Sequence, residues 1–271
     1  MSAKKILISG ASIAGPALAR WLGRNGFDVT VVEKSPGVRP GGQAVDFKGR
    51  THRELLTRMG ILDEVHARQT PKTDWRMVDA NDRVNAVVPG EFIGGDVEIL
   101  RGDLAEILHR RSEQDAEYVF GDEITKMSET SGGVDVSFAG RAAERFDLVI
   151  GADGVHSAVR RLGFGPENEY VEQSGYHYAV ASGHVPLGGL ETVLPSGRAV
   201  AYGYNTPTGS CCSAGRRRPP SSCSAPRAGT TTAGTSDRSG RSWRRLSPTE
   251  GGAPPRRWRL SAPLPTSIWT R

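Results

Sequence analysis

The stretch ILISGASIAGPALARWLGRNGFDVTVVEK, residues 6 to 34, decides the fold of the first part of this chain. Apolar residues run through 4–9 and 28–33, a pattern typical of short buried strands. Between these runs apolar residues recur at helical spacing, and Asn25-Gly26 offers a place for the helix to end. A strand, a helix and a second strand within about 30 residues predict a βαβ unit with a right-handed crossover.

The turn between the first strand and the helix is close to the dinucleotide-binding fingerprint G-x-G-x-x-G. Gly10 and Gly15 occupy the first and third glycine positions, Ser12 stands at the second, and Ile13 and Ala14 lie between. The glycines allow a tight turn and close packing of the helix on the strand, and a small residue at the second position lets the backbone approach a pyrophosphate. The N–H groups at the helix start, with the helix dipole behind them, favour the charge of a phosphate.

The second strand ends on an acid, Glu33, which is followed by Lys34. An acid about 20 residues after the turn can accept hydrogen bonds from a ribose hydroxyl. The order of strand, turn, helix, strand and acid therefore predicts a dinucleotide site that includes Gly10, Ser12, Ile13, Ala14, Gly15, Glu33 and Lys34.

A second interpretation takes Ser12 as the nucleophile of an elbow similar to G-x-S-x-G, with Ala14 in place of the final glycine. Such elbows normally follow several strands of an assembled sheet, whereas this turn begins at residue 10. No spacing selects one of the later histidines as the base: His156, His177 and His184. The order of the elements favours the dinucleotide interpretation.

A third interpretation is a secretory signal peptide, because Lys4 and Lys5 precede apolar residues. Gly10 and Pro16 interrupt that apolar run, and Arg20 follows at helical spacing, so a cytoplasmic chain is expected instead. The sequence lacks the run of about 18 or more apolar residues that a membrane span needs, and we expect no membrane partner.

The composition changes abruptly at Thr206. Ser, Pro, Gly, Arg, Thr and Ala make up 54 of the last 66 residues, and Val, Met, Phe and Tyr are absent there. So few apolar residues cannot offset the entropy of ordering, and disorder is expected over 206–271. Twelve Arg and two acids give this tail a net charge of +10, so the overall +5 leaves −5 for residues 1–205.

The tail also holds all three cysteines: Cys211, Cys212 and Cys223. No Cys-x-x-Cys pair with matching histidines occurs, so neither a metal site nor a disulfide framework is expected. Twelve arginines could tether a nucleic acid through its phosphates. No recognition fold and no stacking pattern accompany them, and we expect no nucleic-acid partner.

Further elements follow along the chain. The pattern predicts helices at 51–59 and 102–112, strands at 118–120, 124–128 and 133–138, a strand, turn and helix within 145–161, and a β-rich segment over 175–204. Together these elements predict an α/β chain.

Three motifs accompany the turn and Glu33: RPGGQAVDFKG (39–49), EILRGDLAEIL (98–108) and DLVIGADGVHSAVR (147–160). With them the chain resembles the class A flavoprotein monooxygenases, which share the para-hydroxybenzoate hydroxylase fold. Within that family it is similar to the branch of tetracycline- and rifampicin-inactivating monooxygenases. The resemblance implies a Rossmann-like FAD-binding domain over 1–170, the truncated start of a β-rich substrate domain over 171–205, and the tail over 206–271.

The resemblance assigns roles to residues of the first motif. Arg39 would help to hold the nicotinamide cofactor, Asp46 would contact FAD, and Gln43 would donate a hydrogen bond to the flavin. A plainer interpretation makes Asp46 a solvated acid in a turn.

The other two motifs receive roles in the same way. Arg101 would reach the FAD phosphates or ribitol, which suit its planar fork of donors; its alternative is a pairing with Asp103 or Glu106. Asp153-Gly154 would touch both FAD and the pyrophosphate of the pyridine nucleotide, although a plain strand-to-helix turn also favours Asp-Gly.

The resemblance implies that NADPH or NADH reduces FAD, which then uses dioxygen to hydroxylate an aromatic or polyketide-like small molecule. The flavin carries this chemistry, so we assign no catalytic acid or base. The alternatives are an FAD- and NAD(P)-dependent oxidoreductase without oxygen insertion, and a remnant without activity. The sequence predicts no oligomeric state.

The resemblance stops near Tyr204. The family continues with a further β-rich substrate layer, a Gly-Asp-Ala motif near the ribityl chain and a long helix, and nothing after Tyr204 matches these features. Arg, Ala, Gly and Pro are residues of GC-rich codons. We therefore expect a frameshift near residues 206 to 213, which reading the gene in its other two frames tests.

Overall fold

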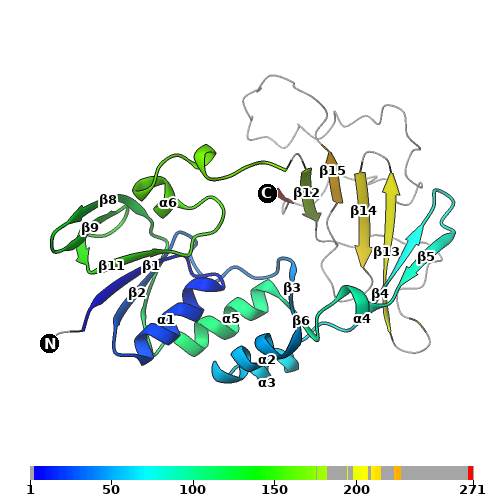
Figure 1. Ribbon diagram of the computed structural model, residues 1–271, viewed down its shortest axis with the longest axis horizontal. Coiled ribbons are helices and arrows are strands. Elements are labelled where there is room, and N and C mark those ends of the chain that lie inside the picture. Colours follow the sequence, from blue (N-terminus) through cyan, green and yellow to red (C-terminus); the bar gives the residue numbers. More distant parts are fainter. Residues whose placement is uncertain are drawn as a thin grey trace. The chain divides into compact units, whose positions relative to one another are not determined.

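The computed structural model describes residues 3–174, 176–181, 194, 198–206, 209–214, 223–226 and 268–270 (Figure 1). The chain divides into two compact units. The first unit comprises residues 1–70 and 96–172, and the second comprises 71–95 and 173–271. The structure thus assigns 71–95 to the second unit, a segment that the sequence analysis placed inside the first domain.

A four-stranded parallel sheet is the centre of the first unit. Its strands lie in the order β11-β1-β2-β7, and their bounds are Leu148–Gly151, Lys5–Ser9, Asp28–Glu33 and Glu117–Phe120. Strand β1 pairs with β2 on one side and with β11 on the other, and Ile8 lies opposite both Val31 and Ile150. Because the strands are parallel, their carboxyl ends share one edge of the sheet. The strands predicted at 4–9 and 28–33 are confirmed.

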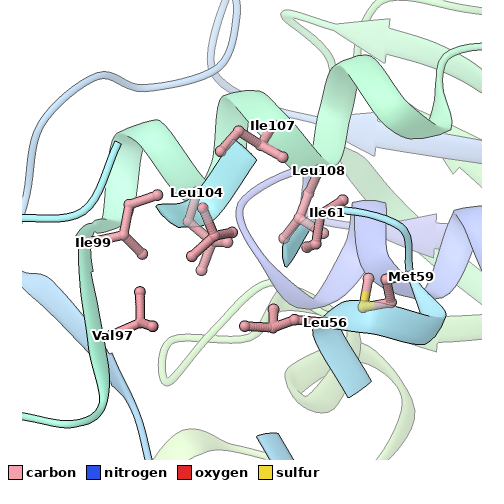
Figure 2. Packing of buried hydrophobic residues seen from close by; sticks show 9 residues of the cluster. Leu56, Met59, Ile61, Val97, Ile99, Leu104, Ile107 and Leu108 are labelled. Atoms are coloured by element: carbon pink, nitrogen blue, oxygen red, sulfur yellow. The ribbon is translucent and has the colours of Figure 1, made fainter. Parts of the chain in front are cut away.

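Helices cover one face of this sheet. Helix α1 (Ala14–Arg24) follows β1 and buries Ala19 against the central strands. Helix α5 (Arg101–Ser112) packs beside α1, and helices α2 (Gly49–Arg58) and α3 (Leu62–Ala67) continue the layer. Figure 2 shows Leu104, Ile107 and Leu108 of α5 in one apolar cluster with Leu56 and Ile61.

The other face of the sheet is covered by a small antiparallel sheet and by helix α6 (Ala158–Gly163). The small sheet has the order β10-β9-β8, with bounds Glu144–Phe146, Gly133–Phe138 and Ile124–Thr130. Leu7 and Val32 pack there against Val136 and Phe146, all nearly inaccessible to solvent. Cover on both faces explains why the parallel strands are apolar throughout instead of alternating.

A two-stranded sheet that the sequence analysis did not predict completes the first unit. Strand β3 (Ala44–Phe47) pairs antiparallel with β6 (Val97–Leu100), and Ala44 lies opposite Leu100. Strand β6 runs directly into α5, so Arg101 stands at a strand-to-helix junction. The pairing brings the 39–43 loop beside this junction. A short 3₁₀ turn, η1 (Glu167–Glu169), lies near the end of the unit.

The second unit is built on a seven-stranded sheet of order β16-β12-β15-β14-β13-β4-β5. Strand β13 (Ala199–Thr206) runs parallel to β4 (Thr73–Val78), and β4 pairs antiparallel with the edge strand β5 (Val84–Val88). Helix α4 (Gly90–Ile93) follows β5. Val200, Tyr202 and Tyr204 of β13 form the core of this unit with Val78.

The remaining strands lie in the segments predicted to be β-rich or disordered. Strand β12 (Tyr176–Ala181) belongs to the predicted β-rich segment, most of whose interior, 182–193 and 195–197, lies outside the described residues. Three short pieces of the tail are strands where disorder was predicted: β14 (Gly209–Ala214), β15 (Cys223–Pro226) and β16 (Ile268–Thr270). Strand β14 pairs antiparallel with β13. This pairing is made by backbone N–H and C=O groups, so it does not require apolar side chains in β14. The rest of the disorder prediction falls outside the described residues.

None of the helices in the described part of the chain has both the length and the apolar character that crossing a membrane requires.

Candidate functional site

The turn from β1 to α1 lies at the carboxyl edge of the parallel sheet. Gly10 has a φ of +107°, and a Cβ on it would lie 2.5 Å from the carbonyl oxygen of Ala152. A Cβ on Gly15 would lie 1.8 Å from the carbonyl oxygen of Gly10. Neither distance leaves room for a side chain, so both glycines are required by the tight turn and by the close approach of the helix.

Helix α1 presents its amino terminus at this turn. The helix begins at Ala14, which is exposed, and the preceding Ile13 provides no side-chain cap because its side chain is apolar and packs against the core. The first N–H groups of a helix have no partner within the helix. Together with the positive end of the helix dipole they provide donors for an anion.

Glu33 at the end of β2 folds back onto the turn. One oxygen of its carboxylate accepts a hydrogen bond from the backbone N–H of Ala11 at 2.9 Å, and the other accepts from the N–H of Ser35 at 2.9 Å. Burial opposes ionisation of this carboxyl group, but the two amide donors, with help from the charge of Arg39, outweigh it and hold the pKa of Glu33 below its usual value. Glu33 is therefore an anion at neutral pH.

Arg101 at the start of α5 reaches across to the turn. Its Nη1 donates to Oγ of Ser12 at 3.2 Å, and its Nη2 donates to the carbonyl oxygen of Gly41 at 3.3 Å. A Cβ on Gly42, whose φ is +94°, would lie 2.5 Å from Nε of Arg101, so the guanidinium lies directly against the glycine backbone. Of the two acids in the predicted alternative, Glu106 pairs with Arg68 at 2.8 Å.

These groups surround a hollow at the surface of the first unit. The hollow is open to solvent and is lined by Ala11, Ser12, Glu33, Gly37, Arg39, Arg101 and Ala105. Two guanidinium groups suit the charge of a diphosphate, and a carboxylate suits the two hydroxyls of a ribose. Four of the residues predicted for the site, Ser12, Glu33, Arg39 and Arg101, therefore meet around one space.

Three residues that line the hollow were not predicted from the sequence. Ala11 lies inside the fingerprint at a variable position, and its N–H carries the contact to Glu33. Ala105 lies four residues after Arg101 on the same face of α5, a spacing that could have identified it. Gly37 belongs to the loop after β2, where nothing in the sequence distinguishes it from an ordinary turn glycine.

Asp153 lies at the end of β11 and joins two elements. Its Oδ2 accepts hydrogen bonds from the N–H of Ala158 at 2.8 Å, from the N–H of Val159 at 3.2 Å and from Oγ of Ser9 at 3.3 Å. Its Oδ1 is buried and has no hydrogen-bond partner in the described part of the chain. Gly154 follows with a φ of +84°. This pair does not line the hollow. Asp153 accepts from the first two amides of α6, whose N-cap residue is Ser157.

The remaining predicted residues lie apart from the hollow. Lys34 is exposed beside Glu33. The carbonyl oxygen of Gln43 accepts a hydrogen bond from the backbone N–H of Arg101 at 2.8 Å. Asp46 is exposed on β3 and lies opposite Glu98 of β6, so it does not lie in a turn.

The contact of Ser12 bears on the nucleophile-elbow interpretation. A nucleophilic serine needs a neighbour that takes its proton, and the group that donates to Oγ of Ser12 is a guanidinium, which remains protonated. His156 pairs instead with Glu167 at 2.9 Å. The side chain of His177 and all of His184 lie outside the described residues. The contacts favour the dinucleotide turn.

Comparisons with known proteins identify the family of this chain. A family model described as an FAD binding domain matches residues 3–176. The chain is 43% identical over 183 residues to the uncharacterized protein Rv1260 of Mycobacterium tuberculosis (strain ATCC 25618 / H37Rv). This match covers 65% of this chain and 49% of that protein. The chain is 42% identical over 171 residues to a flavin-dependent monooxygenase of Legionella longbeachae serogroup 1 (strain NSW150), covering 61% and 43% respectively. The chain spans about half the length of these curated relatives.

The fold of this chain is also similar to that of a solved structure. The crystal structure of tetracycline destructase Tet(55) superimposes with a TM-score of 0.70 at 32% sequence identity, over 83% of this chain and 57% of that chain. The match extends beyond the residues that the family model covers.

Proposed function

We propose, because this chain belongs to the FAD binding domain family and to the class A flavoprotein monooxygenases within it, that the hollow receives the adenosine diphosphate part of FAD. The observation that carries this proposal is the meeting of Ser12, Glu33, Arg39 and Arg101 around the hollow beside the amino terminus of α1. Residues from three separate segments of the chain contribute to it.

Each group has a role that its chemistry suits. The N–H groups at the start of α1 and the guanidinium of Arg101 would bind the diphosphate. Glu33 would accept hydrogen bonds from the ribose hydroxyls. Each of its oxygens is engaged by one amide, and a carboxylate has about four lone-pair sites, so it has acceptors to spare.

Arg39 and Asp153 receive more limited roles. Arg39 lines the hollow beside Glu33, so we propose that it contacts the FAD phosphates, with its predicted role toward NADPH or NADH as a second task. Asp153 holds α6 in place and carries a buried oxygen that has no hydrogen-bond partner among the described residues. We propose that a hydroxyl or a phosphate-bound water of the cofactor satisfies this oxygen, since buried acceptors without partners are costly. Lys34, Gln43, Asp46 and Gly154 remain proposed cofactor contacts that the hollow does not explain.

The reaction itself is proposed by relationship. Bound FAD, reduced by NADPH or NADH, would supply the oxygen transfer from dioxygen to an aromatic or polyketide-like small molecule. The likeness to a tetracycline destructase supports a polyketide-like substrate. The chain's own contribution is to bind and orient the cofactor with the first unit and to offer the sheet of the second unit for the substrate.

Purified chain provides the test. We expect flavin absorption between ~350 and ~500 nm after reconstitution with FAD, and NADPH oxidation that a phenolic or polyketide compound stimulates with formation of an oxygenated product. NADPH oxidation without an oxygenated product would favour an oxidoreductase that does not insert oxygen. Flavin binding without NADPH oxidation would favour a remnant without activity, in line with the frameshift expected near residues 206 to 213.

A further inference from the structure

The dinucleotide fingerprint departs from three glycines at Ser12, and the structure gives this serine a specific partner. Its hydroxyl accepts a hydrogen bond from Nη1 of Arg101, 89 residues later in the chain. A glycine at position 12 would offer Arg101 no acceptor. The hydroxyl therefore joins the turn after β1 to the first residue of α5.

The same guanidinium holds the 39–43 loop. Its Nη2 donates to the carbonyl oxygen of Gly41 at 3.3 Å and to that of Arg39 at 3.5 Å. Its Nε lies so close to Gly42 that a Cβ there would be 2.5 Å away. Arg101 thus lies between the loop on one side and Ser12 on the other.

Backbone contacts seat this loop on the start of α5. The N–H of Gly102 donates to the carbonyl oxygen of Gly41 at 2.8 Å, and the N–H of Arg101 donates to that of Gln43 at 2.8 Å. A Cβ on Gly102 would lie 2.4 Å from the nitrogen of Gly41, so loop and helix are in direct backbone contact. The exchange of the Gly102 N–H with solvent therefore reports whether the loop is seated.

We propose that Ser12 is a positioning residue, and that its hydroxyl fixes the guanidinium of Arg101 so that the 39–43 loop stays seated on α5 before the cofactor binds. We call the contact between Ser12, Arg101 and the 39–43 loop the clasp. The clasp holds the guanidinium of Arg101 at the wall of the hollow. Because this side chain is already ordered, its conformational entropy is not lost when the ligand binds. The nature of the ligand rests on the proposed function, whereas the clasp itself does not.

A different explanation makes the opposite prediction. If serine were only a tolerated replacement for the second glycine, Ser12→Gly would restore the fingerprint and bind FAD as well as the natural chain or more tightly. The clasp predicts instead that Ser12→Gly and Ser12→Ala weaken FAD binding about tenfold, as expected for loss of a hydrogen bond to a charged group.

The experiment measures two quantities on each variant: FAD affinity by titration of the cofactor-free chain, and hydrogen exchange of the Gly102 N–H without FAD. We expect Ser12→Gly, Ser12→Ala and Arg101→Gln to weaken binding and accelerate exchange, and Ser12→Thr, which keeps the hydroxyl, to restore both. The double variant Ser12→Ala with Arg101→Gln should be no worse than Arg101→Gln alone, because the two residues act through one contact. Ser131→Ala, a hydroxyl deletion in the exposed β8–β9 turn, is the matched control and should change neither.

Three outcomes overturn the proposal: unchanged affinity and exchange in Ser12→Gly, faster exchange with unchanged affinity, and additive losses in the double variant. A natural chain that binds no FAD contradicts the proposed function, and the exchange measurement then decides the clasp alone. Ser12→Gly matches the fingerprint, so failure to fold is not expected to obscure the result.

Discussion

The carboxylate of Glu33 lies 2.9 Å from the backbone nitrogen of Ala11 and accepts its hydrogen bond. The contact joins the end of β2 to the turn that follows the neighbouring strand β1. It places an anion beside the start of α1, at the point where the fingerprint requires the acid that binds a ribose. The acid thus stabilises the empty turn and also forms part of the proposed cofactor site.

Replacement of Glu33 tests both roles. Glu33→Ala removes the acceptor for the amides of Ala11 and Ser35, and we expect the free energy of unfolding to fall by about 1–2 kcal/mol and FAD affinity to fall tenfold or more. Glu129→Ala, an exposed acid at the end of β8, is the control and should leave both unchanged. Thermal unfolding and FAD titration measure the two effects, and an unaltered affinity in Glu33→Ala would remove this residue from the site.

The lowered pKa of Glu33 predicts a specific dependence on pH. The folded chain holds this carboxyl ionised more readily than the unfolded chain, so its contribution to stability is complete above the ordinary glutamate pKa of about 4.3 and is lost as the pH falls through the lower, folded value. The difference in unfolding free energy between the natural chain and Glu33→Ala should therefore shrink as the pH falls from neutrality into this range. A difference that grows on acidification would show that burial, not the amide donors, dominates the carboxyl group.

Gly15 tests the close approach of α1 to the turn. In Gly15→Ala the new Cβ would meet the carbonyl oxygen of Gly10, and we expect a loss of at least about 2 kcal/mol in stability together with loss of FAD binding. Gly132→Ala is the control, because its Cβ would have its nearest neighbour at 3.6 Å in ordinary contact. Equal stability of the two variants by chemical denaturation would contradict the geometry of the turn.

Asp153 requires two variants, because it stabilises α6 through Oδ2 and also carries the buried Oδ1, which has no hydrogen-bond partner among the described residues. Asp153→Ala removes the acceptor for the amides of Ala158 and Val159 and should cost about 1–2 kcal/mol. Asp153→Asn keeps one acceptor oxygen and should preserve most of that stability while it lowers FAD affinity. Stability measured by denaturation and affinity measured by titration separate the two effects; a full-affinity Asp153→Asn chain would make Asp153 a structural residue alone.

Local pattern was sufficient to predict β1, α1 and β2. Their buried apolar runs and Gly15, whose Cβ would meet the carbonyl oxygen of Gly10, follow from contacts within about 30 residues, the span of one βαβ unit. The same holds for α5 and for the small antiparallel sheet, whose strands are neighbours in sequence. For these parts the periodicity of the sequence and the packing of the elements agree.

Contacts between distant residues account for what the sequence did not reveal. Strand β4 carries charges that obscure its pattern, and its strand partners are β13, more than 120 residues later in the chain, and β5. The partner of Ser12 is 89 residues away, so no local pattern indicates that its hydroxyl has a function. Asp153 was predicted to touch a cofactor. Its contacts with the first amides of α6 were not predicted, because they depend on how the chain turns between β11 and α6.

Hydrogen exchange measured with and without FAD tests the central claim, that the hollow is the cofactor site. The account predicts that bound FAD slows exchange at the amides of residues 10–15, which end at the start of α1, and across the 33–43 segment, while the β8–β9 hairpin is unchanged. A chain that retains flavin absorption but shows protection elsewhere would contradict this account, as would a folded chain that binds no FAD at all.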